Sequence, residues 1–157
     1  NSRLRIPVHV GCDYAIRMRI ELKRAGPQTS VSLNFPIGNE SEASLLLGKG
    51  GRESCELYGL GPIEELSGFD FRRNRPVDLR LYVMTLARGR ARLMLWLDET
   101  QMLDWSGPIS QVDLLEQRAG GATYYPAFRI GAASGVEFSS IAVRPLRDMP
   151  PEAEPAQ

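Results

Sequence analysis

The 157-residue sequence predicts an all-β fold, with about nine short antiparallel strands arranged as a sandwich or a barrel. Two observations predict it. Apolar and polar residues alternate with a period of two through most of the chain, which fits strands and not helices. Turn signals separate these segments roughly every 8 to 12 residues. A helical pattern is limited to 112–117, where we expect a single turn.

The N-terminal third contains four predicted strands. The segment 14–22 (YAIRMRIEL) has one apolar and one polar face, as expected of a half-buried antiparallel strand. Its apolar face carries Tyr14, Ile16, Met18, Ile20 and Leu22, and its other face carries Ala15, Arg17, Arg19 and Glu21. The segment 31–38 (VSLNFPIG) repeats the pattern, and Pro36 near its end suits an edge or a strand terminus. Shorter strands are predicted at 44–47 and 54–60.

The strongest pattern is a hairpin formed by 77–86 (VDLRLYVMTL) and 91–98, joined by the basic turn ARGR. A short strand is expected at 104–108 (DWSGP), and 128–131 and 136–145 supply the last two strands. In the last strand, alternation puts Val136, Phe138, Ser140 and Ala142 on one face, with Glu137, Ser139, Ile141 and Val143 on the other.

Composition argues against several partners. Nineteen basic and nineteen acidic residues give no net charge, whereas a protein that reads the phosphate backbone of a nucleic acid normally has a basic excess. No apolar run approaches the ~20 residues of a membrane helix. We therefore expect no nucleic-acid partner and no membrane insertion. We expect one domain over 1–147 and a disordered tail or linker over 148–157, in a piece excised or processed from a longer protein. The sequence does not determine the compartment. We expect a soluble domain that is either extracytoplasmic or part of a multidomain protein.

The C-terminal two-thirds of the chain resembles a known family. The segments PVDLRLYV, LMLWLDETQMLDWSGP and YYPAFRIGAASGVEFSSIAVRPL, in this order, are similar to concanavalin A-like (laminin-G-like) jelly-roll domains, in particular those related to the 3-keto-disaccharide hydrolase domain family. The elements that carry the resemblance are Leu97-Asp98-Glu99, Trp105-Ser106-Gly107, Ile130-Gly131 and the strand 136–146.

The resemblance covers about residues 3–147 and implies an antiparallel two-sheet jelly-roll sandwich. It also implies that Trp105 packs in the core at a strand end. One departure is that Glu99-Thr100 stands where such domains usually have Gly, which predicts a longer or differently shaped hairpin loop.

Catalytic patterns are missing from the sequence. There is no alternating carboxylate array, and the adjacent Glu64 and Glu65 are expected in a solvated loop. The single histidine, His9, has no GxSxG nucleophile motif to accompany it. The GKGG segment at 48–51 is typical of a hairpin turn and not of a phosphate loop. We therefore predict no catalytic residues, no metal and no cofactor.

The two cysteines allow two interpretations. Cys12 and Cys55 are too far apart in sequence for a CxxC-type zinc site. We expect them to be packed thiols, with a Cys12–Cys55 disulfide as the alternative.

A possible binding surface follows from the central hairpin. If its leucines fill the core, the opposite face of the two strands carries Arg80, Tyr82, Met84, Met94 and Trp96. Apolar patches of this kind usually mark an interaction. Three interpretations remain open: an aromatic platform for a sugar ring, a patch covered by a loop such as 114–125, or a contact with a partner domain.

A second candidate surface is the loop 118–126 (RAGGATYYP), where Tyr124 and Tyr125 are either ligand contacts or packed on the sandwich. The sequence therefore predicts a non-catalytic module of a larger protein that binds carbohydrate or protein through an outer sheet face, with a glycan or a neighbouring protein domain as partner. The alternatives are an enzyme of the keto-glycoside hydrolase type and a structural spacer packed on neighbouring domains.

Overall fold

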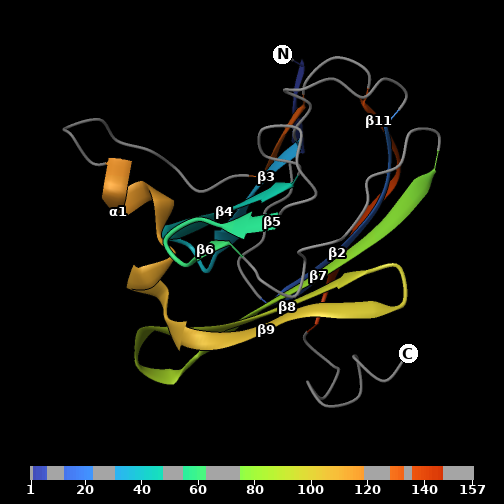
Figure 1. Ribbon diagram of the computed structural model, residues 1–157. Helices are drawn as coiled ribbons and strands as arrows, with labels where there is room; N and C mark the ends of the chain where they lie inside the picture. Colours follow the sequence, from blue (N-terminus) through green and yellow to red (C-terminus); the bar gives the residue numbers. More distant parts are fainter. Residues whose placement is uncertain are drawn as a thin grey trace.

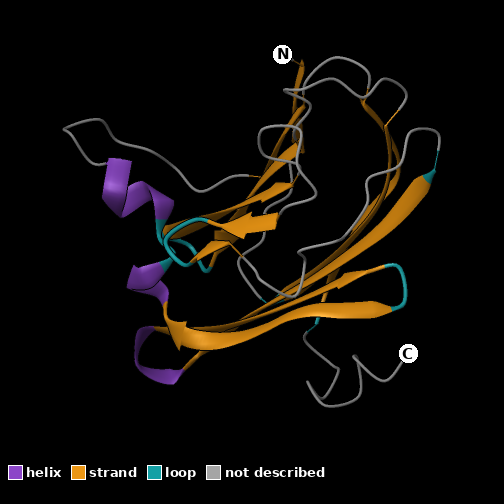
Figure 2. Ribbon diagram, in the orientation of Figure 1, coloured by secondary structure: helices purple, strands orange, loops and turns teal. Residues whose placement is uncertain are grey.

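Two antiparallel sheets packed face to face form the protein, as Figures 1 and 2 show for the computed structural model. The structure describes residues 2–6, 13–22, 31–47, 55–62, 75–118, 128–132 and 136–146. The predicted fold class, an all-β jelly-roll sandwich of antiparallel sheets, is confirmed.

The first sheet has six strands, with each neighbouring pair antiparallel. In spatial order these are β1 (Ser2–Ile6), β10 (Phe128–Ala132), β3 (Val31–Ile37), β4 (Ser41–Leu47), β5 (Cys55–Leu57) and β6 (Gly61–Pro62). The helix α1 (Leu114–Arg118) contacts β4 on this sheet and confirms the single helical turn expected in this region.

The second sheet has five strands and carries the long hairpin. In spatial order these are β11 (Val136–Pro145), β2 (Tyr14–Leu22), β7 (Pro76–Leu86), β8 (Arg90–Leu97) and β9 (Thr100–Pro108). The basic turn between β7 and β8 is a short 3-10 segment, Ala87–Gly89, in which Arg88 and Gly89 both have positive φ.

The core lies between the sheets and contains the alternate apolar residues of both. On β7 these are Val77, Leu79, Leu81 and Val83, each at most 1 % exposed. Tyr14 of β2 joins the two sheets, because its hydroxyl donates a 2.6 Å hydrogen bond to the Pro36 carbonyl of β3. Burial, together with the negative charge of Glu42, raises the pKa of Tyr14 well above its ordinary value. The hydroxyl is therefore a donor over the whole physiological pH range.

The last strand departs from the predicted alternation. The register of β11 against β2 shifts between Ser139 and Ala142, and Ser140 has a φ of 54°. This β-bulge adds one residue, so Ile141 and Val143 pack against the core on the same side as Val136 and Phe138, and the predicted division of the strand into two faces is wrong beyond Ser139. A strictly period-two pattern cannot reveal such a shift. As a result, Ala142 and Arg144 lie on the outer face of the second sheet.

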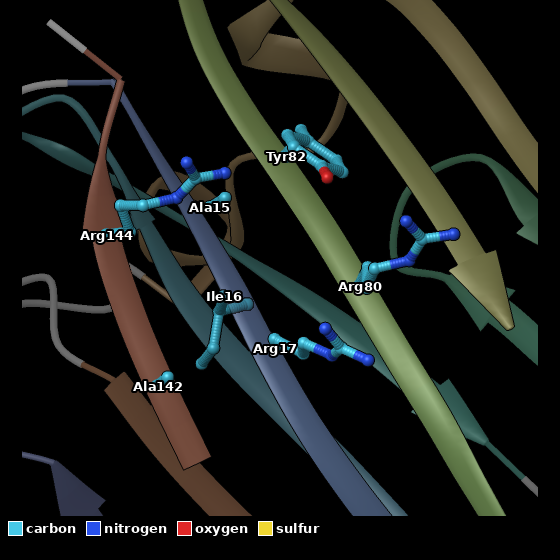
Figure 3. A pocket seen from close by; sticks show the side chains of 7 residues that line it. All are labelled: Ala15, Ile16, Arg17, Arg80, Tyr82, Ala142 and Arg144. Atoms are coloured by element: carbon cyan, nitrogen blue, oxygen red, sulfur yellow. The ribbon is translucent and has the colours of Figure 1, made fainter. Parts of the chain in front are cut away.

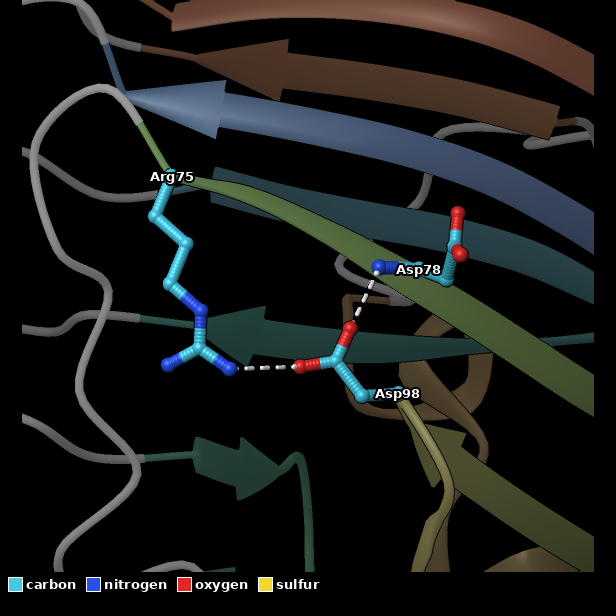
Figure 4. Close-up of polar contacts among 3 residues, drawn as sticks. All are labelled: Arg75, Asp78 and Asp98. Atoms are coloured by element: carbon cyan, nitrogen blue, oxygen red, sulfur yellow. Dashed lines mark hydrogen bonds and ion pairs between the residues drawn. The ribbon is translucent and has the colours of Figure 1, made fainter.

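The β8–β9 hairpin is held at its tip by Asp98. Leu97 pairs with Thr100, so the loop has only two residues, and of the two predicted alternatives, a longer or a differently shaped loop, the longer loop is wrong. Asp98 has a φ of 53°, a conformation that Asp tolerates better than most residues. Its backbone N–H donates to the Asp78 carbonyl (2.7 Å), and its carboxylate accepts from the Asp78 N–H (3.1 Å) and from Arg75 (3.3 Å; Figure 4).

Trp105 is a residue of β9. It is partly buried and packs against the core, as the resemblance implied, but it lies inside the strand and not at a strand end. Its ring lies over Gly107, where a Cβ atom would come within 2.6 Å of the ring atom Cζ2. Glycine at 107 therefore makes room for the indole.

We expect Gly107→Ala to destabilise the protein by about 1–3 kcal/mol, because the added methyl forces the Trp105 ring away from its packed position. Thermal unfolding followed by circular dichroism measures the loss. The neighbouring exposed residue provides the control, since Ser106→Ala should change stability by no more than about 0.5 kcal/mol. Equal melting temperatures for Gly107→Ala and wild type would contradict the packing described here.

We expect Asp98→Ala to cost about 1–3 kcal/mol, because it leaves the Asp78 N–H without its carboxylate acceptor and puts Ala at positive φ. Asp98→Asn keeps one acceptor oxygen and tolerates the same φ, so it should lose less than half as much. Urea unfolding of both variants gives the comparison. If both lose the same amount, the carboxylate contact is not what stabilises the hairpin.

Candidate functional site

The predicted patch on the central hairpin forms a second, smaller apolar cluster on the outer face of the five-stranded sheet. Met94 is fully buried, and Met84, Tyr82 and Trp96 are 4–5 % exposed. Leu146, directly after β11, packs with them, and we refer to these five residues as the outer cluster. Residues of the same chain therefore cover the Trp96 side chain. Of the three interpretations that the sequence left open, cover within the chain explains this burial.

Only 114–118 of the loop expected to cover the patch, 114–125, is described. This part, α1, contacts β4 of the other sheet. The described residues that pack with the outer cluster from outside the hairpin are Leu146 and the partly buried Ala15 of β2. The Leu146 N–H donates to the Asp13 carbonyl (2.9 Å), which fixes it at the end of β11.

An ion pair borders the outer cluster on the β9 side. Arg92 is opposite Met84 and Asp104 is opposite Met94 in the strand register. The Arg92 guanidinium donates two hydrogen bonds to the Asp104 carboxylate, at 3.0 and 2.9 Å. Hydrogen bonding to Arg92 lowers the pKa of Asp104, and the positive charge adds to this, against the smaller raising effect of burial. The positive charge of Arg92 is thus neutralised within the face.

An open hollow lies beside the outer cluster, across β11, β2 and β7. It has a volume of about 340 Å³ and is lined by Ala15, Ile16, Arg17, Arg80, Tyr82, Ala142 and Arg144 (Figure 3). Arg80 and Tyr82 were predicted from the sequence as binding residues, and the structure brings them together with Arg17 and Arg144.

The strand register explains the shape of the hollow. One row across the three strands is Arg144, Ala15 and Tyr82, and the next row is Ala142, Arg17 and Arg80. Strands in a sheet are about 4.8 Å apart, so the six side chains form a compact grid. Each row contains one alanine, and the missing side-chain volume at these two positions leaves space between longer neighbours.

Three arginines line this space, and all three lean in the same direction. In Figure 3, Arg144 extends from β11 toward β2, Arg17 from β2 toward β7, and Arg80 from β7 toward β8. Among the described residues that line the hollow, none is acidic. The arrangement presents several N–H donors of guanidinium groups around a small apolar floor.

The outer cluster positions two of the lining residues. The Arg80 guanidinium carbon lies 5.8 Å from the Trp96 ring centroid, within the range of a cation–π contact. Nη2 of Arg80 also donates to the Asp98 carbonyl at 3.5 Å. Tyr82 packs edge-on against Trp96, with ring centroids 5.3 Å apart. The buried indole thus orients the residues at the edge of the hollow.

Sequence reasoning missed five of the seven residues that line the hollow. Arg17 and Ala15 are on the polar face predicted for 14–22, but only the pairing of β2 with β7 shows that they adjoin Arg80 and Tyr82. Ala142 and Arg144 reach the same face through the β-bulge. The sequence pattern of β2 shows which residues share its polar face. It does not show which strands lie next to β2.

Several other predicted features have no described geometry. Residues 48–51, Glu64, Glu65 and the tail 148–157 lie outside the described residues, and of Cys55 only the backbone is described. His9, Cys12, Tyr124 and Tyr125 also lie outside the described residues. Their predicted roles stay predictions.

Two buried acids in the described part of the chain have structural contacts. An Asp113 carboxylate oxygen accepts from the Leu115 N–H (3.0 Å), at the start of α1, and from the Glu42 N–H (3.3 Å) of β4. Asp113 therefore caps the helix and attaches it to the sheet. Within the described ranges, no group of three or more His, Cys, Asp or Glu residues could hold a metal ion. None of the described helices is long and apolar enough to cross a membrane.

Comparison with known structures shows a shared β-sandwich fold. No family model and no curated protein sequence matches the chain. The carbohydrate-binding module CBM66 from Bacillus subtilis has a similar structure, with a TM-score of 0.52, 10% identity, and 85% of this chain and 76% of that one covered. The alginate lyase Aly36B gives a TM-score of 0.54 at 10% identity, over 87% of this chain and 71% of that one. The chain thus has the fold of these β-sandwich proteins.

Proposed function

We propose that this domain is a non-catalytic carbohydrate-binding module, and that the saccharide binds in the hollow lined by the three arginines and Tyr82. The observation that carries the proposal is the grid of long polar and small apolar side chains on neighbouring strands of a rigid sheet. Sugar sites need hydrogen-bond donors and apolar contact area together, since a sugar ring has hydroxyl groups at its edge and C–H groups on its faces.

The lining residues supply both kinds of contact. Guanidinium groups donate to hydroxyl and ring oxygens in fixed directions, and the tyrosine hydroxyl both donates and accepts. Ala15 and Ala142 form an apolar floor. The volume of about 340 Å³ is at the lower end of the range of small-molecule sites, which is about 300–1,000 Å³.

The outer cluster has a supporting role in this proposal. Trp96, Met84 and Met94 are buried beneath or beside the ligand and hold Arg80 and Tyr82 in place. The predicted ligand contacts of Tyr124 and Tyr125 stay a separate proposal, since both residues lie outside the described residues. The similar fold of CBM66 is consistent with saccharide binding, and the alginate lyase Aly36B, an enzyme, has an equally similar fold. At 10% identity no residue role is carried over from either protein.

The test fills the hollow without changing its charge. We expect Ala142→Leu to abolish saccharide binding on a glycan array and in isothermal titration, because the leucine occupies the space between Arg144 and Arg17. Ser139→Leu is the matched control, since Ser139 is exposed on the same strand and does not line the hollow. The control should bind like the wild type.

Other outcomes would count against the proposal. If the wild type binds no saccharide, the domain is not a carbohydrate-binding module. If Ala142→Leu binds as well as the control, saccharide binding occurs elsewhere on the protein. Trp96→Ala is unsuitable for this test, because removing a buried tryptophan costs about 3–5 kcal/mol of stability.

A further inference from the structure

We propose that the C-terminal segment of this chain, 147–157, docks on the basic turn between β7 and β8. The docking uses an apolar contact with Leu86 and ion pairs with Arg88 and Arg90. The segment lies outside the described residues, and its sequence is RDMPPEAEPAQ. The turn is the 3-10 segment at one end of the five-stranded sheet (Figure 2).

The outer face of β7 ends in an exposed apolar residue. Tyr82, Met84 and Leu86 follow one another along this face. The first two are buried in the outer cluster, at 5 and 4 % exposure, whereas Leu86 is 42 % exposed. The strand β2 begins at Tyr14, opposite Val83, so among the described strands none pairs with β7 beyond that point on the β2 side. The apolar surface of the outer cluster therefore extends to a residue that is left largely uncovered.

Two arginines flank Leu86. Arg90 is directly opposite it in the hairpin register, and Arg88 is at the tip of the turn. Both are exposed, and within the described part of the chain neither side chain has an ion pair or a hydrogen bond. Arg92, the next arginine on the outer face of β8, is paired with Asp104. The turn thus combines an exposed apolar side chain with two guanidinium groups that are open to acidic groups.

The backbone of Arg88 also favours a contact at the tip of the turn. Arg88 has a φ of 61° and a ψ of 39°, in the left-handed region that Gly and Asn tolerate better than arginine does. Residues held in such conformations cluster at contact and functional sites. Gly or Asn would serve better if the turn only had to reverse the chain, so the arginine favours a role for the guanidinium.

The segment 147–157 starts beside this turn. Leu146, the last described residue, donates its N–H to the Asp13 carbonyl (2.9 Å). The Asp13 carboxylate accepts from the Thr85 N–H (2.8 Å) and from the Thr85 hydroxyl (2.9 Å), and Thr85 precedes Leu86. The strands β11 and β7 are separated by β2, so they are about 10 Å apart, which about three extended residues span. Residues from 149 onward can therefore reach the turn.

The segment matches the turn in chemistry and in order. Met149 and the two prolines after it offer apolar surface to Leu86, and Glu152 and Glu154 follow them. A Pro- and Glu-rich composition predicts disorder in isolation, and such segments order when they bind. Each exposed ion pair contributes little, but the segment is tethered about 10 Å from the turn, so its effective concentration there is high. Weak contacts can therefore hold it within the same chain.

Amide order parameters from 15N relaxation of the full chain test the docking. Values of about 0.85 mark rigid backbone, and values below about 0.6 mark flexible backbone. In the wild type at low ionic strength, we expect the amides of Met149, Glu152 and Glu154 to lie above about 0.6. Arg88→Gln and Arg90→Gln should each lower these values, and the double variant should bring them below about 0.6. The amides of the sheets, recorded in the same spectra, show that each variant is folded.

Matched variants assign the docking to the turn. Arg19→Gln removes the same charge from an exposed position elsewhere on the outer face, so it should leave the order parameters of the segment unchanged. Arg88→Glu with Arg90→Glu should lower them. Glu152→Arg with Glu154→Arg, added to the same chain, should restore them, because reversal of both sides restores the attraction.

Four outcomes would overturn the docking, and none of them depends on saccharide binding in the hollow. Segment amides below about 0.6 in the wild type would show that the segment does not dock. Values unaffected by Arg88→Gln and Arg90→Gln would place its contact elsewhere. An equal loss in Arg19→Gln would show attraction to the charge of the whole domain. Order parameters that rise with protein concentration, together with a doubled molecular mass, would show docking on a second copy and not within the chain.

Discussion

The antiparallel pairing of β2 with β7 is the contact on which both faces of the five-stranded sheet depend. On the inner face it aligns Ile16 with Leu81 and Met18 with Leu79, all of them at most 1 % exposed in the core. On the outer face the same register aligns Ala15 with Tyr82. Because side chains alternate strictly along a strand, a slip of one residue would exchange the two faces. The apolar core therefore fixes the arrangement of the candidate site.

The β-bulge in β11 also affects both faces of the five-stranded sheet. Without the extra residue near Ser140, Ile141 and Val143 would face outward and Ala142 would point into the core. The bulge changes the phase of the strand, so that the core gains two aliphatic residues and the outer face gains Ala142 and Arg144. The bulge thus adds the residues of β11 that line the hollow to those of β2 and β7.

The bounds of the strands could be predicted from the sequence better than the order of the strands in each sheet. Alternation located β2 and β11 with the bounds that the structure has, because a half-buried strand must repeat with period two. The outer patch at Arg80 and Tyr82 followed from the same pattern. Arg17 could not be added, since strand order depends on contacts between segments far apart in the chain, and periodicity carries no information about them. The burial of Trp96 was open for the same reason.

The apolar outer face of β8 has a structural explanation. Met94 and Trp96 stand where a solvated strand would carry polar residues, and the outer cluster buries them with Leu146. A surface that contains a buried indole can hold a guanidinium in place by a cation–π contact, whereas an arginine on a fully solvated face keeps its rotamer freedom. Arg80 differs from Arg17 in this respect, since Arg17 is exposed. A ligand in the hollow would therefore meet a fixed donor group, Arg80 of β7, and an adaptable one, Arg17 of β2. The fixed group would restrict the orientation of the ligand, and the adaptable group would tolerate variation in its structure.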